Sequence, residues 1–156
     1  MNENTLTGLD LEPIMVKVMD KEEGLGWTLE FTRRVAIEYE KYLILCKENP
    51  EAAVVPSSSV DEFWHFHILD TQKYQEDCQN YFGYFLHHFP YFGMRGKADE
   101  ENLKMAWADS CALYETRFGK LPSDLWSASK RCPNCGRRCR SAIYAMDQRP
   151  RLAVAS

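Results

Sequence analysis

Residues 27–46 read WTLEFTRRVAIEYEKYLILC, and this stretch decides the fold class. Large apolar residues recur in it every three or four positions, at Trp27, Phe31, Val35, Tyr39, Tyr42 and Cys46. Side chains at this spacing share one face of an α-helix, so the pattern predicts a helix that packs on a core. Asn49-Pro50 marks its end, because proline cannot continue a helix.

The same spacing recurs on both sides of this stretch. It predicts a helix within Leu9–Met19, a second from Ser59 to near Gly83, and a third from Asp99 to Phe118. The run Ser59-Val-Asp-Glu62 matches a capping box, which predicts a helix start at Ser59. No segment resembles a β-hairpin. We therefore expect an all-α fold, a compact bundle of about four helices followed by a C-terminal Cys-rich basic tail.

Composition narrows the class of protein. The chain has 156 residues, of which 45% are hydrophobic and 27% charged, as expected for one soluble globular domain. No apolar run approaches the roughly 20 residues that span a bilayer. The N-terminus lacks the basic and apolar regions of a signal peptide. These features predict a cytoplasmic protein with no membrane partner.

Charge divides the chain into two parts. Residues 130–156 hold seven basic residues and one acidic residue, a net charge of +6 within a chain whose total is −4. We therefore expect a helical histidine-motif domain at residues 1–129 and a basic, partly disordered tail at residues 130–156.

All four histidines fall within the 24 residues from His65 to His88, close to several carboxylates. Histidine titrates near neutral pH and is the commonest metal ligand. On one continuous helix, however, His65 and His67 point about 200° apart. His65 would also lie about 25 Å from the helix end, whereas His88 can reach back only about 20 Å. The three histidines can therefore converge only if the helix bends near Asp70.

Three interpretations of this segment remain open. In one, His65, His67 and His88 bind a metal, with Asp61, Thr71, Tyr74 and Cys78 as supporting or proton-transferring residues. Mixed imidazole and carboxylate ligands suit zinc first and non-haem iron second, and an open position would allow water activation. In the second, the histidines form a structural hydrogen-bond network, with His65 held by Asp61 and His88 capping a backbone group. In the third, they bind a small ligand or a partner directly. Cys78 is interpreted first as a buried structural thiol.

Residues 60–74 follow the pattern VDxxWHxHILDTxxY, and Asp77-Cys78, Phe82-Gly83 and His87-His88-x-Pro90 continue it. This combination resembles the glycine-rich domain-containing protein-like family, whose biochemical activity is not established. The resemblance singles out nine residues here: Asp61, Trp64, His65, His67, Thr71, Tyr74, Cys78, His88 and Pro90. Longer members carry a glycine-rich region. This chain has only eight glycines, so the roles linked to that region are not transferred.

The tail carries a second candidate metal site. The run Cys132-Pro-Asn-Cys135-Gly136 is typical of the tight turn of a zinc knuckle, which supplies two thiolates, and Cys139 could add a third. A zinc knuckle, an iron–sulfur cluster or reduced thiols would each fit three clustered cysteines. Nearby arginines could contact an unknown protein partner or make weak nucleic-acid contacts.

Two functions follow from these observations. The first is a small metal-binding protein, with zinc as the metal, in which the Trp-His-x-His and His-His-x-Pro segment forms the functional site and could be catalytic. The alternative is a non-enzymatic adaptor that binds a protein or a nucleic acid through the basic cysteine tail. Whether the chain is an enzyme, and on what substrate, is left open by the sequence.

Overall fold

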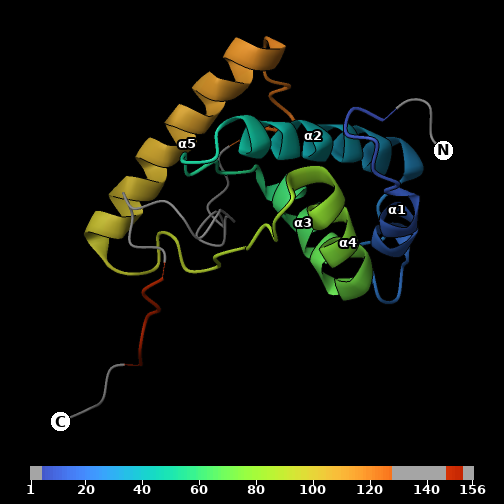
Figure 1. Cartoon of the computed structure of the whole chain (residues 1–156), viewed down its shortest axis with the longest axis horizontal. Helices are drawn as coiled ribbons and strands as arrows, with labels where there is room; N and C mark the ends of the chain where they lie inside the picture. The colour runs from blue at the N-terminus through green and yellow to red at the C-terminus, as the bar shows by residue number, and fades with distance from the viewer. Residues whose placement is uncertain (1–4, 128–146, 153–156) are drawn as a thin grey trace.

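The computed structural model describes residues 5–127 and 147–152, and these form five helices with no strand (Figure 1). The all-α prediction is confirmed for this part of the chain. None of the described helices is long and apolar enough to cross a membrane.

Helix α2 (Leu29–Glu48) is the centre of the fold, as the periodicity of residues 27–46 predicts. Thr28 caps it, since its hydroxyl accepts a hydrogen bond from the Phe31 amide at 3.2 Å. Its inward face is fully buried at Val35, Tyr39 and Tyr42. These side chains pack in the main core with residues of the helices that come directly before and after α2 in the chain.

Helix α1 (Glu12–Met19) contacts α2 and α3 and buries Ile14 and Val18 against them. The segment before α1 is tied to α2 by Glu40, whose carboxylate accepts from both the amide and the hydroxyl of Thr7, at 2.8 and 2.9 Å. The N-terminal segment is therefore part of the packed domain.

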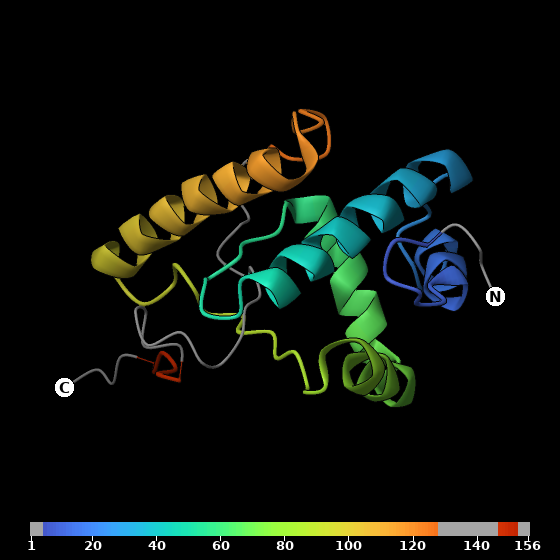
Figure 2. The ribbon, with the colours of Figure 1, turned by 45° about the horizontal axis from the view of Figure 1, so that its top comes forward.

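The predicted helix over residues 59–83 is two helices, α3 (Ser58–Leu69) and α4 (Thr71–Phe82). The break falls at Asp70, which ends α3 and begins α4 with its carboxylate accepting from the Lys73 amide at 3.4 Å. The capping prediction is wrong in detail: the cap of α3 is Ser57, whose hydroxyl accepts from the Val60 amide. Figures 1 and 2 show α3 and α4 in green, meeting at an angle beside α2.

Helix α5 (Lys97–Phe118) contacts α2 but extends away from the other helices (Figure 2). It starts two residues before the predicted Asp99 and ends at the predicted Phe118. Glu38 of α2 anchors this side: its carboxylate accepts from Tyr114 of α5 and from the indole of Trp126, both at 2.7 Å. A second, smaller apolar cluster joins the first half of α5 to Val55, Phe89 and Phe92.

Candidate metal centre

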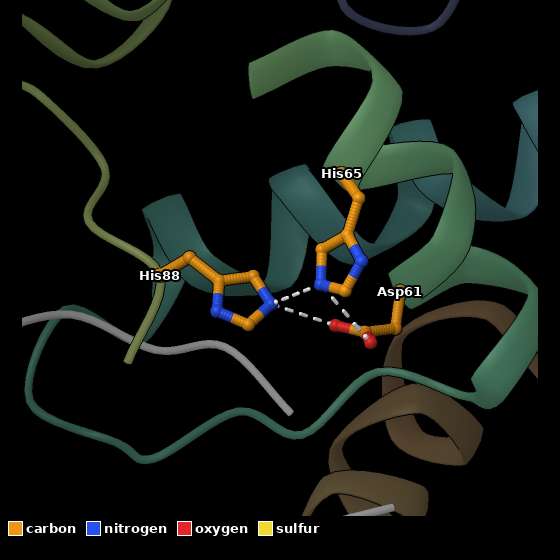
Figure 3. Close-up of side chains that lie close together, drawn as sticks. All are labelled: Asp61, His65 and His88. Carbon is orange, nitrogen blue, oxygen red and sulfur yellow. Dashed lines mark hydrogen bonds and ion pairs between the residues drawn. The ribbon is translucent and has the colours of Figure 1, made fainter. Parts of the chain in front are cut away.

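Three side chains meet at one point on the surface of α3. Asp61 and His65 lie one turn apart on α3, and His88 approaches from the segment after α4, pointing at both (Figure 3). The Nε2 atoms of His65 and His88 are 2.8 Å apart. The Asp61 carboxylate places one oxygen 2.9 Å from Nε2 of His88 and the other 3.3 Å from Nε2 of His65.

The return of the chain after α4 brings His88 to α3. Helix α4 ends at Gly83, whose φ of +78° is a left-handed conformation that glycine adopts without strain. The hydroxyl of Tyr74 then fixes the returning segment: it donates to the carbonyl of Leu86 and accepts from the Trp64 indole at 2.9 Å. The Trp64 ring also packs on the His88 ring, with 4.5 Å between centroids. His88 is therefore held by the core beneath it.

The three residues differ in their exposure. The side chains of His88 and Asp61 are 8% and 11% exposed, whereas that of His65 is 43% exposed. The site thus has a buried side, formed by Asp61 and His88, and one side open to solvent.

The electrostatic environment favours the neutral form of His65. Burial lowers the pKa of its imidazole, and the neighbouring His88 lowers it further, against the opposing effect of Asp61. A neutral imidazole with a free nitrogen lone pair is the form that binds a metal.

The spacing of the two imidazole nitrogens and the two Asp61 oxygens fits a metal-ion site. In a tetrahedral zinc site with bonds of about 2.0–2.1 Å, neighbouring ligand atoms lie about 3.3 Å apart. The three separations here, 2.8, 2.9 and 3.3 Å, need only a small outward movement to reach that value. Three protein ligands with one solvent-facing position are also the ligand number of catalytic zinc sites.

His67 does not join this group. It points to the opposite side of α3, as the helical spacing predicts, and is only 1% exposed. Its Nε2 lies 2.7 Å from the Asp77 carboxylate and its Nδ1 lies 2.6 Å from the Tyr39 hydroxyl. Because a carboxylate can only accept, Nε2 carries a hydrogen; burial raises the pKa of Tyr39, so its protonated hydroxyl donates to Nδ1.

His67 therefore joins α2, α3 and α4 through two buried hydrogen bonds. Its partner Asp77 also pairs with Lys73 at 3.0 Å. Both residues line a pocket of about 330 Å³ between α4 and the segment around Gly8. In the sequence pattern, only the spacing of two residues between His65 and His67 separates this network from the candidate metal ligands.

The other predicted residues occupy different positions. Thr71 is exposed at the start of α4, and Tyr74 supports His88 as described above. Cys78 is buried, and burial raises the pKa of its thiol, so it stays protonated at neutral pH. The predicted tail ligands Cys132, Cys135 and Cys139 lie outside the described residues.

Three residues near these histidines have no role predicted from the sequence. Tyr39 and Asp77 lie 28 and 10 residues from His67 and meet it only through the packing of three helices. Ser58 has a buried hydroxyl without a hydrogen-bond partner in the described part of the chain. Its position three residues before Asp61 and seven before His65 is the one signal that could have indicated it.

A family model described as UCP032817-like matches residues 4–122, which include all five helices and the three residues of the candidate site. Comparison with curated proteins and with solved structures gave no match. The resemblance to the glycine-rich domain-containing protein-like family is wrong, because the matching model describes a different family. The Trp-His-x-His run on which the resemblance rested lies within one helix, α3. The chain belongs to the UCP032817-like family, which is uncharacterised.

Proposed function

We propose that this protein binds a divalent transition-metal ion, zinc first, through Asp61, His65 and His88. The observation that carries the proposal is the convergence of two imidazole nitrogens and one carboxylate within 2.8–3.3 Å of one another. These atoms come from two segments that are 23 residues apart in the chain.

The alternative is that Asp61, His65 and His88 form a purely structural hydrogen-bond network, and the network around His67 shows what such an arrangement looks like in this protein. At His67 each ring nitrogen has a separate partner, a donor on one side and an acceptor on the other. At the candidate site, by contrast, the same Nε2 atom of His88 faces both the Nε2 of His65 and a carboxylate oxygen. Two imidazole N–H groups could both donate to the carboxylate, but they would then face each other across 2.8 Å, whereas a cation between the three groups would suit every lone pair.

The ligand set supports zinc and leaves iron as the second choice. Two imidazoles and one carboxylate form three-residue sites for zinc, and the same set with open positions binds non-haem iron(II). When bound at an open position, zinc lowers the pKa of its water ligand to about 7. The solvent-facing side at His65 would admit that water. Asp61 has a second oxygen that could accept its proton.

Metal analysis of the purified full-length chain tests this proposal. We expect about one zinc per chain at this site, competition with a chromophoric chelator, and loss of that zinc in His65→Ala and His88→Ala. His87→Ala is the matched control, because His87 is exposed and its ring packs on Phe85. Serine replacement of all three tail cysteines separates any zinc held there.

Thermal unfolding gives an independent reading. Free zinc at 100 times its dissociation constant should stabilise the folded state by about 2.7 kcal/mol, which is roughly 5–11 °C for a domain of this size. Wild-type protein that binds no zinc or iron would refute the proposal. So would His65→Ala and His88→Ala variants that keep their affinity.

A second candidate function rests on the charge asymmetry of the chain. Residues 130–156 have a net charge of +6 and lie outside the matched family region. We propose that they contact an acidic protein or the phosphates of a nucleic acid. Binding to RNA or DNA that weakens steeply with salt and depends on the tail arginines would support this adaptor function.

A further inference from the structure

The pocket of about 330 Å³ between α4 and the segment before α1 has the size of a small-molecule site, at the lower end of the usual range of about 300–1,000 Å³. Residues 7–10 form one wall, and Lys73, Asp77, Asn80 and Tyr81 form the other. None of the three residues of the candidate metal centre lines it, so the pocket is a separate place on the protein.

The α4 wall of this pocket is polar, although it faces another segment of the chain. Residues 73, 77, 80 and 81 have the spacing of a single helix face. A helix face that packs against another segment is normally apolar, but this one carries an ammonium, a carboxylate, an amide and a phenol. A few polar groups that converge on a small pocket are what orient and select a ligand.

Asp77 has one carboxylate oxygen available to this pocket. The residue is only 9% exposed, and its Oδ2 atom accepts from Nε2 of His67 at 2.7 Å and pairs with the Lys73 ammonium at 3.0 Å. No described residue donates to Oδ1. Among the described side chains, only Ser58 has a polar atom that is both enclosed and without a partner. Oδ1 is therefore open to the pocket that its residue lines.

The opposite wall adds a second carboxylate. Asp10 uses its Oδ1 atom to accept from the Glu12 amide at 3.1 Å, and no described residue donates to its other oxygen. The charged residues that line the pocket are thus two carboxylates, Asp10 and Asp77, and one ammonium, Lys73, a net charge of −1. This balance favours a ligand with a positive charge.

The groups just outside the lining leave this balance unchanged. The Lys47 ammonium lies 4.2 Å from the centre of the Tyr81 ring, so this ring already attracts a cation. Glu40 is only 5% exposed, accepts two hydrogen bonds from Thr7 and has no cationic partner among the described residues. These two charges offset each other, and the net charge around the pocket remains −1.

We propose that this pocket binds the ammonium group of a small organic amine, which donates a hydrogen bond to Oδ1 of Asp77 and is attracted by the carboxylate of Asp10. A protonated amine neutralises the net charge of the lining, and its N–H groups match oxygens that lack a donor. Binding at this site needs no metal and is independent of the proposed metal centre.

Titrations of the wild-type full-length chain with n-butylamine and with n-butanol test this inference. Butylamine is protonated at pH 7, and butanol is its uncharged counterpart of the same length. We expect saturable shifts in amide NMR signals of residues 7–10 and 73–81 with butylamine, and an affinity at least about tenfold weaker with butanol. A third titration, with 4-aminobutyrate, distinguishes the source of the ammonium group. Tighter binding than butylamine indicates an amino acid whose carboxylate reaches Lys73, and weaker binding indicates a simple amine.

Two matched variants test the charge attraction. Asp10→Asn removes one charge but keeps an oxygen that can accept from the Glu12 amide, so the start of α1 is preserved. We expect its affinity for butylamine to be about two- to fivefold weaker, the effect of one exposed charge. Asp20→Asn is the control and should bind like the wild type. Asp20 also accepts from backbone amides, those of Glu22 and Glu23, but does not line the pocket.

The hydrogen bond to Asp77 has its own variant. Asp77→Asn should weaken butylamine binding at least about tenfold, with circular dichroism as the check that the variant is folded. The comparison of butylamine with butanol uses the wild type alone and does not depend on any variant. Three results would each overturn the inference: no saturable shift with butylamine, equal affinity for butanol, or Asp10→Asn binding butylamine as tightly as the wild type.

Discussion

Replacing Tyr74 by phenylalanine removes one hydroxyl that makes two buried hydrogen bonds. It accepts from the indole of Trp64 and donates to the carbonyl of Leu86, and both partners are fully buried. Burial raises the pKa of Tyr74 far above its ordinary value, so the hydroxyl stays protonated and can donate. The aromatic ring remains in the variant, so packing is kept.

The cost follows from the two groups left without partners. An unsatisfied buried donor or acceptor costs about 1–3 kcal/mol, so Tyr74→Phe should destabilise the protein by about 2–4 kcal/mol. For a chain of this length that lowers the melting temperature by roughly 5–15 °C. With an m-value of about 2 kcal/mol/M, the urea midpoint should fall by about 1–2 M. The segment that carries His88 also loses its anchor, so the zinc affinity of the proposed metal site should fall.

Urea denaturation followed by tryptophan fluorescence and by circular dichroism measures this cost. Tyr81→Phe is a suitable control, because Tyr81 is on the same helix and its side chain is only partly buried. That variant should stay within about 0.5 kcal/mol of the wild type. A loss of less than 0.5 kcal/mol in Tyr74→Phe would show that its hydroxyl does not anchor the His88 segment.

Three further predictions test the rest of the fold. Burial raises the pKa of Asp77, but hydrogen bonds from His67 and a lysine outweigh this and lower it below 3.8. The Asp77 carboxylate therefore stabilises the folded state above about pH 3.8, and this stabilisation is lost as the pH falls through the lower pKa of the folded state. In Asp77→Asn, the urea midpoint measured from pH 2.5 to 6 should fall less steeply at acid pH than in the wild type. An unchanged slope would contradict this. Glu38 accepts from three donors, and Glu38→Gln should cost about 2–3 kcal/mol in chemical denaturation, whereas equal stability would show that the carboxylate is not needed. Gly93 has a φ of +90°, and an added Cβ would lie 2.6 Å from Leu103, so Gly93→Ala should lower stability by at least about 1–2 kcal/mol; a neutral effect would mean that this turn relaxes.

The helices could be predicted from sequence because each buries a continuous apolar stripe. Val35, Tyr39 and Tyr42 are fully buried on α2, where the spacing places them. The opposite orientations of His65 and His67 also followed from helix geometry alone. These features depend on local periodicity, which a sequence shows directly.

Features that depend on contacts between segments could not be predicted in the same way. From sequence, Asp70 could either continue or end a helix. In the structure α3 ends there, and the indole of Trp64 in α3 donates to the hydroxyl of Tyr74 in α4 across the break. The capping residue of α3 could not be chosen from sequence, because three adjacent serines offer similar local chemistry. In the structure it is Ser57 and not Ser59. The pairing of His88 with α3 depends on a carbonyl, that of Leu86, which has no signature in sequence.

The spacing of two residues between His65 and His67 has a consequence for redesign. The inner imidazole is enclosed by three helices, and any replacement there must refill its volume and satisfy two polar partners. The outer imidazole stands at a rim where a side chain of different size or charge can be accommodated. Position 65 is therefore the one to vary in order to change the cation preference of the proposed metal site, while position 67 keeps the scaffold that presents it.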